Sequence, residues 1–90
     1  MVTSIILMKI KRKKVNEIAE QLAGIEGFSE VFSVTGNYDL IAIVRVKDND
    51  SLSDLITNNL QHIEGIEKTD TMLAFKAYSK HDLDLMFDFD

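Results

Sequence analysis

The sequence predicts an α+β domain with the ferredoxin-like βαββαβ order, in which a four-stranded antiparallel sheet carries both helices on one face. Three observations lead to this prediction. First, β-prone and amphipathic segments follow one another as strand, helix, strand and again strand, helix, strand. Second, residues 5–8 and 40–44 are apolar at consecutive positions, which is typical of central strands covered on both faces. Third, the tripeptide Ile-Glu-Gly occurs at 25–27 and at 63–65, each time between a helix and its returning strand.

The first half of the pattern consists of a strand, a helix and a second strand. Residues 2–10 are β-prone and lack helical periodicity, so we expect the first strand there. A helix should follow and end near Gly24. Its apolar positions at helical spacing are Val15, Ile18, Ala19 and Leu22. The second strand is expected over residues 30–35.

A hairpin at Gly36-Asn37 is expected to join the second and third strands. Both residues tolerate positive φ, and the residues on either side favour strands. The third strand is expected over residues 38–47, and together with the first strand it should form the centre of the sheet.

The second half begins at residues 48–51, a cluster that favours turns and helix caps. Ser51, with Asp54 three residues later, predicts a capping box at the start of the second helix. The helix should end before Gly65, and its buried stripe should consist of Leu52, Leu55, Ile56, Leu60 and Ile63. Residues 68–78 alternate and predict the fourth strand. One face of it should carry Thr69, Thr71, Leu73, Phe75 and Ala77.

The length of the chain suits one domain, which we place at residues 1–78, followed by a tail at 79–90. In the tail, Ser79 and Asp82 resemble a capped helix start, and Leu83, Met86 and Phe87 follow at helical spacing. A short amphipathic helix is therefore predicted there.

The predicted sheet has one face that its own helices cannot cover. That face would expose large apolar side chains of the central strands in a monomer. We therefore expect a second subunit to cover it in a homodimer.

The composition excludes several classes of protein. Cysteine is absent, which excludes disulfides and thiolate metal sites and fits a cytoplasmic protein. The apolar runs are too short to cross a bilayer, and no signal peptide is recognised because basic residues follow the first apolar segment. The net charge of −5 opposes binding to phosphate backbones. We expect neither a membrane nor a nucleic acid as a direct partner.

No catalytic, metal or cofactor site is predicted. His62 and His81 lie outside any recognised metal-ligand spacing, and acidic pairs such as Asp48 and Asp50 are explained as caps or solvated residues. The basic cluster at residues 9–14 is interpreted as a solvated turn. Its place before a helix is electrostatically unfavourable for that helix, which leaves another use open.

Asp39 begins an otherwise apolar strand directly after the hairpin turn, and it has two interpretations. In the structural one, its carboxylate accepts a hydrogen bond from the turn backbone, as aspartates commonly do. In the functional one, the carboxylate binds the ammonium group of a small molecule while N–H groups of the turn hold a carboxylate. The residues taken alone favour the structural role.

Two motifs stand out within this pattern: Val-Thr-Gly-Asn-Tyr-Asp at 34–39 and Thr-Asp-Thr at 69–71. With the βαββαβ order, they resemble the effector-binding domain of the leucine-responsive and asparagine regulators, the Lrp/AsnC family, over nearly the whole chain. The longer members of that family carry a DNA-binding helix-turn-helix domain before this module. Because the chain begins at the first strand of the module, it resembles the stand-alone members. The resemblance implies a regulatory module and not an enzyme.

The resemblance also implies a ligand, an assembly and a site. Stand-alone members dimerise through their sheets in an α/β-barrel-like assembly, can form rings of dimers, and are thought to bind amino acids between subunits. One side of the effector site would be the hairpin of one subunit, formed by Thr35, Gly36, Asn37, Tyr38 and Asp39. The other side would be Thr69 and Thr71 of a neighbouring subunit. The implied partners are a free amino acid or a close analogue, further copies of this chain, and full-length Lrp/AsnC-type regulators.

Two alternatives remain open. Small dimeric ferredoxin-like proteins include oxygenases and isomerases, but such an enzyme needs a histidine or an acid facing the pocket between sheet and helices. This sequence places aliphatic residues there. The other alternative is a ligand-free assembly module that contacts a full-length regulator through the same sheet surface, and ligand binding would distinguish it.

Overall fold

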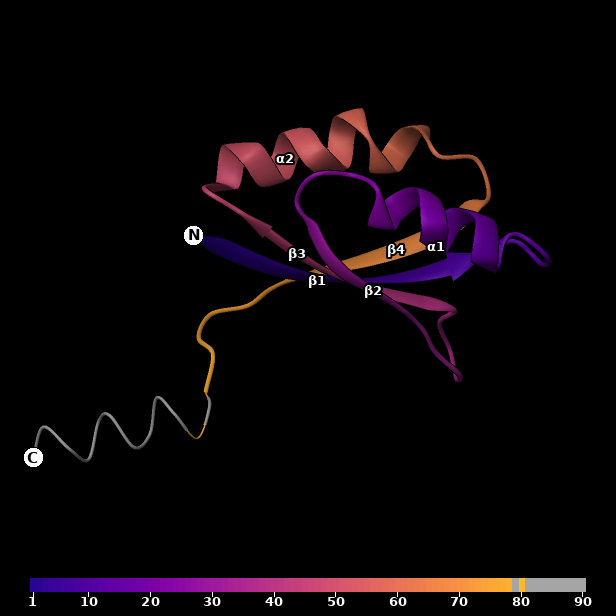
Figure 1. Cartoon of the computed structure of the whole chain (residues 1–90), viewed down its shortest axis with the longest axis horizontal. Coiled ribbons are helices and arrows are strands. Elements are labelled where there is room, and N and C mark those ends of the chain that lie inside the picture. The colour runs from indigo at the N-terminus through magenta and orange to yellow at the C-terminus, as the bar shows by residue number, and fades with distance from the viewer. Residues whose placement is uncertain (79, 81–90) are drawn as a thin grey trace, which may run out of the picture.

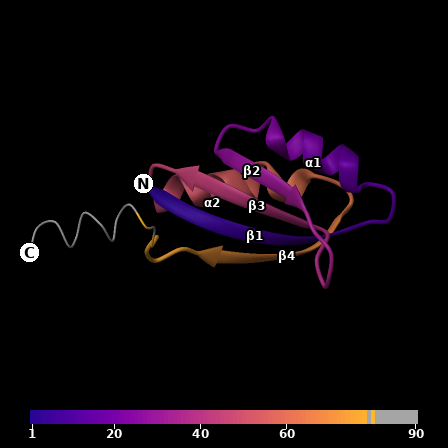
Figure 2. The ribbon, with the colours of Figure 1, turned by 60° about the horizontal axis from the view of Figure 1, so that its bottom comes forward.

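The computed structural model describes residues 1–78 and 80, and it shows one sheet with both helices on the same side (Figure 1). The elements are β1 (Val2–Ile10), α1 (Val15–Ala23), β2 (Phe28–Ser33), β3 (Leu40–Val46), α2 (Asn49–Asn58), the 3-10 turn η1 (Leu60–His62) and β4 (Ile66–Leu73). All strand pairs are antiparallel, in the order β2-β3-β1-β4 (Figure 2). The predicted fold class and the central position of the first and third strands are confirmed.

The core lies between the helices and alternate residues of the two central strands. From β1 and β3 it takes Ile6, Met8, Ile10, Leu40, Ala42 and Val44, and from the helical segments Ile18, Leu22, Leu55 and Leu60. Ser4 is the one fully buried polar residue in the described part of the chain, and its hydroxyl donates to the carbonyl oxygen of Met72 at 2.8 Å. This hydrogen bond removes the cost of burying the hydroxyl and ties β1 to β4.

The face of the sheet opposite the helices, here called the open face, carries a contiguous apolar band. Strand register aligns its members in two rows across the sheet. The central side chains are partly buried, whereas Phe32 and Met72 at the two ends are 48% and 47% exposed. The band consists of Ile5, Leu7, Phe32, Ile41, Ile43 and Met72. The single chain thus leaves one face of its sheet uncovered, as the sequence predicts.

Both Ile-Glu-Gly repeats return the chain to the sheet in the same way. Gly27 and Gly65 have φ of +101° and +103°, a region that glycine enters without steric cost. The carbonyl oxygen of Gly27 accepts from Arg45 N at 2.9 Å, and that of Gly65 accepts from Lys11 N at 2.8 Å. Each repeat therefore fixes a glycine turn against a neighbouring strand or its end.

The start of the second helix differs from the prediction. Asp48, not Ser51, is the N-cap, because its extended backbone lets the carboxylate accept from Ser51 N at 2.8 Å. The predicted Ser51 capping box is therefore wrong. The apolar stripe is also divided: α2 ends at Asn58, and Leu60 belongs to η1.

Strand boundaries differ from the prediction where pairing partners end. β4 covers Ile66–Leu73 and not 68–78, because β1 begins at Val2 and the last bond between the two segments runs from Ala74 N to Thr3 O at 2.9 Å. β2 begins and ends two residues earlier than predicted, and β3 begins two residues later. The predicted tail helix lies outside the described residues. Within the described residues, no helix has the length and apolarity needed to span a membrane.

Candidate functional site

The hairpin between β2 and β3 is a longer loop than the predicted two-residue turn. Val34 N donates to Asp39 O at 3.0 Å and closes a loop over residues 34–39. Gly36 has a φ of +109°, and a Cβ built on it would have no neighbour within 4 Å. Thr35, Gly36 and Asn37 are all exposed. The tip of the hairpin therefore presents its backbone to the surroundings.

Asp39 has a structural contact, although its donor is not the turn backbone. Its Oδ2 accepts from Ile10 N at 2.8 Å, and its own N–H donates to Met8 O at 2.9 Å. Ile10 is only 4% exposed, so this N–H has little access to water. No further hydrogen bond to the Asp39 carboxylate comes from the described residues. One carboxylate oxygen thus holds the end of β1, and the other has no hydrogen-bond partner among the described residues.

Tyr38 connects the hairpin to β4. Its hydroxyl donates to Asp70 Oδ2, and this hydrogen bond, aided by desolvation and the nearby charge of Asp70, raises the pKa of Tyr38. Lys68 Nζ lies 6.0 Å from the centre of the Tyr38 ring. Asp70 is paired with Leu7, which places it on the open face. The hairpin accordingly bends away from the helices (Figure 1).

Thr69 and Thr71 lie on the other face of β4. They are paired with Met8 and Ile6, the residues of β1 that face the helices. Both threonines are exposed. Within one chain, the hairpin therefore reaches β4 through Asp70 on the open face, whereas the two threonines point to the helix side. A single subunit does not bring the two predicted halves of the site together.

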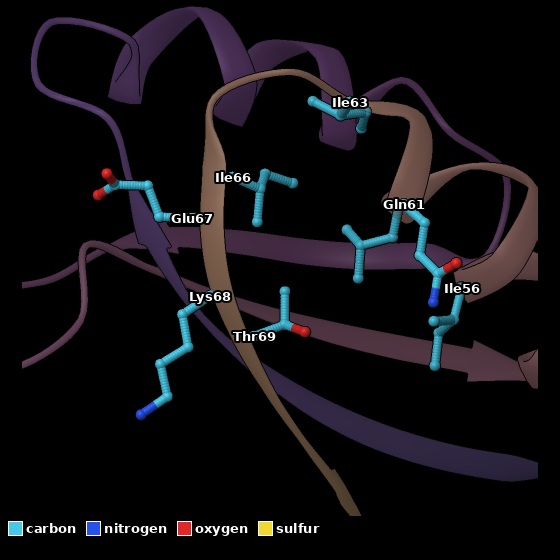
Figure 3. A pocket seen from close by; sticks show the side chains of 8 residues that line it. Ile56, Gln61, Ile63, Ile66, Glu67, Lys68 and Thr69 are labelled. Carbon is cyan, nitrogen blue, oxygen red and sulfur yellow. The ribbon is translucent and has the colours of Figure 1, made fainter.

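A cavity of about 190 Å³ lies next to Thr69, between the end of α2, η1 and the start of β4 (Figure 3). Its lining includes Ile56, Leu60, Ile63 and Ile66, which sequence reasoning assigned to the core or did not single out. The spacing of these apolar residues in the sequence indicates that they are buried, but it does not indicate that their packing leaves a cavity. A larger hollow of about 550 Å³ lies at the opposite end of the sheet and includes none of the predicted site residues.

No metal centre is apparent in the described part of the chain, where no group of three His, Asp or Glu side chains is placed to hold an ion. The hairpin and the two threonines supply hydrogen-bond donors and one carboxylate instead. Such groups suit a small ligand with both an ammonium and a carboxylate.

Comparisons with known proteins agree with this architecture. A family model described as the Lrp/AsnC ligand binding domain matches residues 3–83. The protein TTHA0845 from Thermus thermophilus is 41% identical, with a TM-score of 0.83 over 89% of this chain and 100% of that chain. The HTH-type transcriptional regulator FL11 of Pyrococcus furiosus is 32% identical over 79 residues, which are 88% of this chain and 52% of the regulator. This chain thus spans about half the length of the curated relatives it matches.

A further solved structure is a transcriptional regulator from Neisseria meningitidis in complex with L-Met. Its TM-score is 0.78 at 18% identity, over 87% of this chain and 52% of that chain. At this identity the likeness concerns the fold alone.

Proposed function

This chain belongs to the Lrp/AsnC ligand-binding domain family, and from that premise we propose that it binds a free amino acid, or a close analogue, between the subunits of a homo-oligomer. Its curated relatives are transcription regulators and not enzymes, which confirms the expectation that the chain is not an enzyme. The ligand, the assembly, a cytoplasmic location and the partners belong to the proposal.

The placement of the two threonines relative to the hairpin carries this proposal. The hairpin contacts β4 on the open face through Tyr38 and Asp70, whereas Thr69 and Thr71 point to the helix side. A ligand that touches both the hairpin and the threonines therefore needs them from different subunits. Intersubunit binding of this kind makes the ligand a regulator of assembly.

The chemistry of the two halves suits the two charged ends of an amino acid. The carboxylate oxygen of Asp39 that does not accept from Ile10 can pair with an α-ammonium group. Hairpin N–H groups near Gly36 and the threonine hydroxyls can donate to an α-carboxylate. Charge-assisted bonds of both kinds are stronger than bonds between neutral groups.

The open face supports a homodimer as the basic assembly. Its apolar band crosses all four strands, and the end members Phe32 and Met72 are about half exposed. A face of this kind is stabilised when a second copy removes it from water. Rings of dimers would then bring a hairpin to the threonines of a neighbouring dimer.

Regulation would act through a partner that carries a DNA-binding domain. The relatives named as HTH-type regulators match this chain over about half of their length. We expect mixed assembly with such full-length regulators, which would change their oligomeric state or their response to the effector. Co-purification of a family regulator with this chain from the source cell would support this part, and its consistent absence would count against it.

Calorimetric titration of the chain against the twenty amino acids tests the central proposal. Saturable binding of at least one of them is expected. If none binds, the ligand-free assembly module becomes the better description.

Subunit complementation then tests whether the site is shared. Asp39→Asn changes only the hairpin, and the double variant Thr69→Val/Thr71→Val changes only the strand; each alone should bind weakly. After complete subunit exchange in an equal mixture, one half of the hairpins and one half of the strands are intact, so about a quarter of the sites should recover. No recovery would mean that both groups act on a ligand within one chain.

A further inference from the structure

Asp70, the central residue of the Thr-Asp-Thr motif, lies on the opposite face of β4 from the two threonines. A bulge sets this orientation, because the register with β1 shifts just beyond Lys9 and Glu67 is the extra residue. After the bulge, Lys68 and Asp70 lie on the open face, and the side chain of Lys68 points away from that of Thr69 (Figure 3). The strand itself therefore separates Asp70 from a ligand that the threonines of the same chain hold.

The hydrogen bond from the Tyr38 hydroxyl to Asp70 ties the hairpin to the far edge of the sheet. In the order β2-β3-β1-β4, strand β1 lies between the hairpin strands and β4, so this contact crosses β1. Among the hydrogen bonds of the described residues, it is the one that joins the hairpin to β4. Lys68 Nζ lies 6.0 Å from the centre of the Tyr38 ring, near the limit of a cation–π contact. β4 thus holds Tyr38 by its hydroxyl and by its ring.

The tip of the hairpin has no comparable support. Residues 35–37 are exposed, and the loop is closed by the hydrogen bond from Val34 N to Asp39 O. A ligand that binds a mobile loop must order it, and the loss of conformational entropy weakens binding. Tyr38 adjoins both the tip and Asp39, so its contact with β4 limits the positions that both can take before a ligand arrives.

The Tyr38 hydroxyl is occupied by this contact. A phenol has one hydrogen to donate, and the carboxylate of Asp70 accepts it. Within the described residues, Asp70 has no other hydrogen bond and no ion pair. Its full negative charge therefore strengthens the bond to Tyr38.

We propose that Tyr38 and Asp70 are positioning residues of the effector site. Their hydrogen bond holds the hairpin in the conformation that binds the ligand, and neither side chain contacts the ligand itself. The inference rests on the proposed function, because it concerns the same hairpin. It gives Tyr38 a different role from the one that the resemblance implies, and it adds Asp70, which the resemblance leaves out.

Titration of the Tyr38 phenol tests the bond without any ligand. The chain has two tyrosines, so Tyr78→Phe leaves Tyr38 as the one phenol whose absorbance changes with pH. The hydrogen bond to Asp70, desolvation and the charge of Asp70 raise the pKa of Tyr38 above its ordinary value of 10.0. In the double variant Tyr78→Phe/Asp70→Ala, the midpoint should fall towards 10.0. Equal midpoints with and without Asp70 would overturn the inference.

Calorimetry then measures the effect of positioning, with the amino acid that binds the wild type most tightly among the twenty. Tyr38→Phe and Asp70→Ala should each weaken binding about 2- to 10-fold. An exposed hydrogen bond contributes modestly, and the apparent affinity falls in proportion to the population of the binding conformation. The double variant Tyr38→Phe/Asp70→Ala should bind no more weakly than either single variant, because each change removes the same bond.

Two further variants serve as controls. Asp70→Asn keeps an acceptor oxygen and should recover part of the affinity that Asp70→Ala loses. Tyr78→Phe removes the hydroxyl of an exposed tyrosine that also lies beside a lysine, Lys76, and this variant should bind like the wild type.

Other patterns of affinity would contradict the positioning role. A loss in Tyr38→Phe with normal binding by Asp70→Ala would mean that the hydroxyl contacts the ligand. Normal affinity in both variants would mean that the hairpin is positioned without this bond, while the proposed function would stand. Additive losses in the double variant would mean two independent roles. Binding of no amino acid by the wild type would overturn the proposed function and this inference together.

Discussion

Replacing Asp39 by alanine and by asparagine should separate its contribution to stability from its contribution to binding. In the folded chain, Asp39 Oδ2 accepts from Ile10 N at 2.8 Å, and Ile10 is 4% exposed. Alanine removes this acceptor and leaves the N–H without a partner in a nearly dry position. Asparagine can keep an oxygen in the same place while it removes the charge that the ligand ammonium would need.

The magnitudes follow from this geometry. Loss of a hydrogen bond to a charged group costs about 1.5–3 kcal/mol, so Asp39→Ala should lower the free energy of unfolding by about that amount. For a domain of this size each kcal/mol corresponds to about 4–8 °C in Tm, so a decrease of roughly 6–24 °C is expected. Asp39→Asn should lose less than about half of that, because a neutral hydrogen bond remains. Both variants should bind the effector amino acid about 10- to 150-fold more weakly.

Thermal unfolding and calorimetric titration measure the two effects separately. Protein concentration must be equal in all samples, because assembly makes Tm depend on it. If Asp39→Asn unfolds as easily as Asp39→Ala, the oxygen that holds Ile10 N is not the stabilising element. If Asp39→Asn binds the effector like the wild type, the ammonium group is recognised by another residue.

Three further changes have expected outcomes that follow from single contacts. Gly65→Ala should lower the free energy of unfolding by about 2 kcal/mol or more in urea, since the φ of Gly65 is +103° and a Cβ would lie 2.8 Å from Ile18 Cδ1. Gly24→Ala is the control: its φ is −85° and its Cβ would make only ordinary contacts, so this variant should be as stable as the wild type or slightly more stable. Leu7→Glu places a charge in the apolar band of the open face. Light scattering should then show a monomer for the variant and the proposed dimer for the wild type, and a dimer that persists in the variant would mean another interface. Asp48→Ala removes the cap of α2. The hydrogen bond from the Ser51 N–H lowers the pKa of Asp48 below its ordinary value of 3.8. The wild type should therefore be more stable than this variant above pH 3.8, and the difference should disappear as the pH falls through the lowered pKa. A difference that persists in stronger acid would contradict the assignment of Asp48 as the cap.

Local patterns were sufficient to predict the sheet and its centre. Ile5 to Met8 and Leu40 to Val44 are apolar at every position, which is typical of central strands. The ends of the elements were less predictable because they depend on partners distant in sequence. β4 ends at Leu73, and the last hydrogen bond to β1 is made one residue later, from Ala74 N to Thr3 O. Within the turn before α2, the backbone of Asp48 decides the cap between two suitable residues.

From the sequence, the candidate site could be assigned to the hairpin and to the last strand. Which face of that strand carries Thr69 and Thr71 could not be predicted. The contact from Asp39 to Ile10 N spans 29 positions, and nothing in the local sequence indicates it. The bulge at Glu67 is equally invisible, because it arises from the register between β1 and β4. This bulge decides that Thr69 points to the helix side, and therefore that hairpin and threonines are separated in one chain.

The Tyr38–Asp70 contact places the hairpin at the border of the proposed dimer surface. Asp70 is paired with Leu7, so it stands in the same row of the open face as the apolar band. A second subunit on that face would pack beside the contact and restrict the position of Tyr38, and with it the backbone up to Asp39. A ligand that pairs with Asp39 binds more tightly when the hairpin is already ordered, because less conformational entropy is lost. Since linkage is reciprocal, the same ligand must then stabilise the assembly. If the proposed dimer and the proposed ligand site both hold, assembly and effector binding would be coupled through the hairpin loop at residues 34–39.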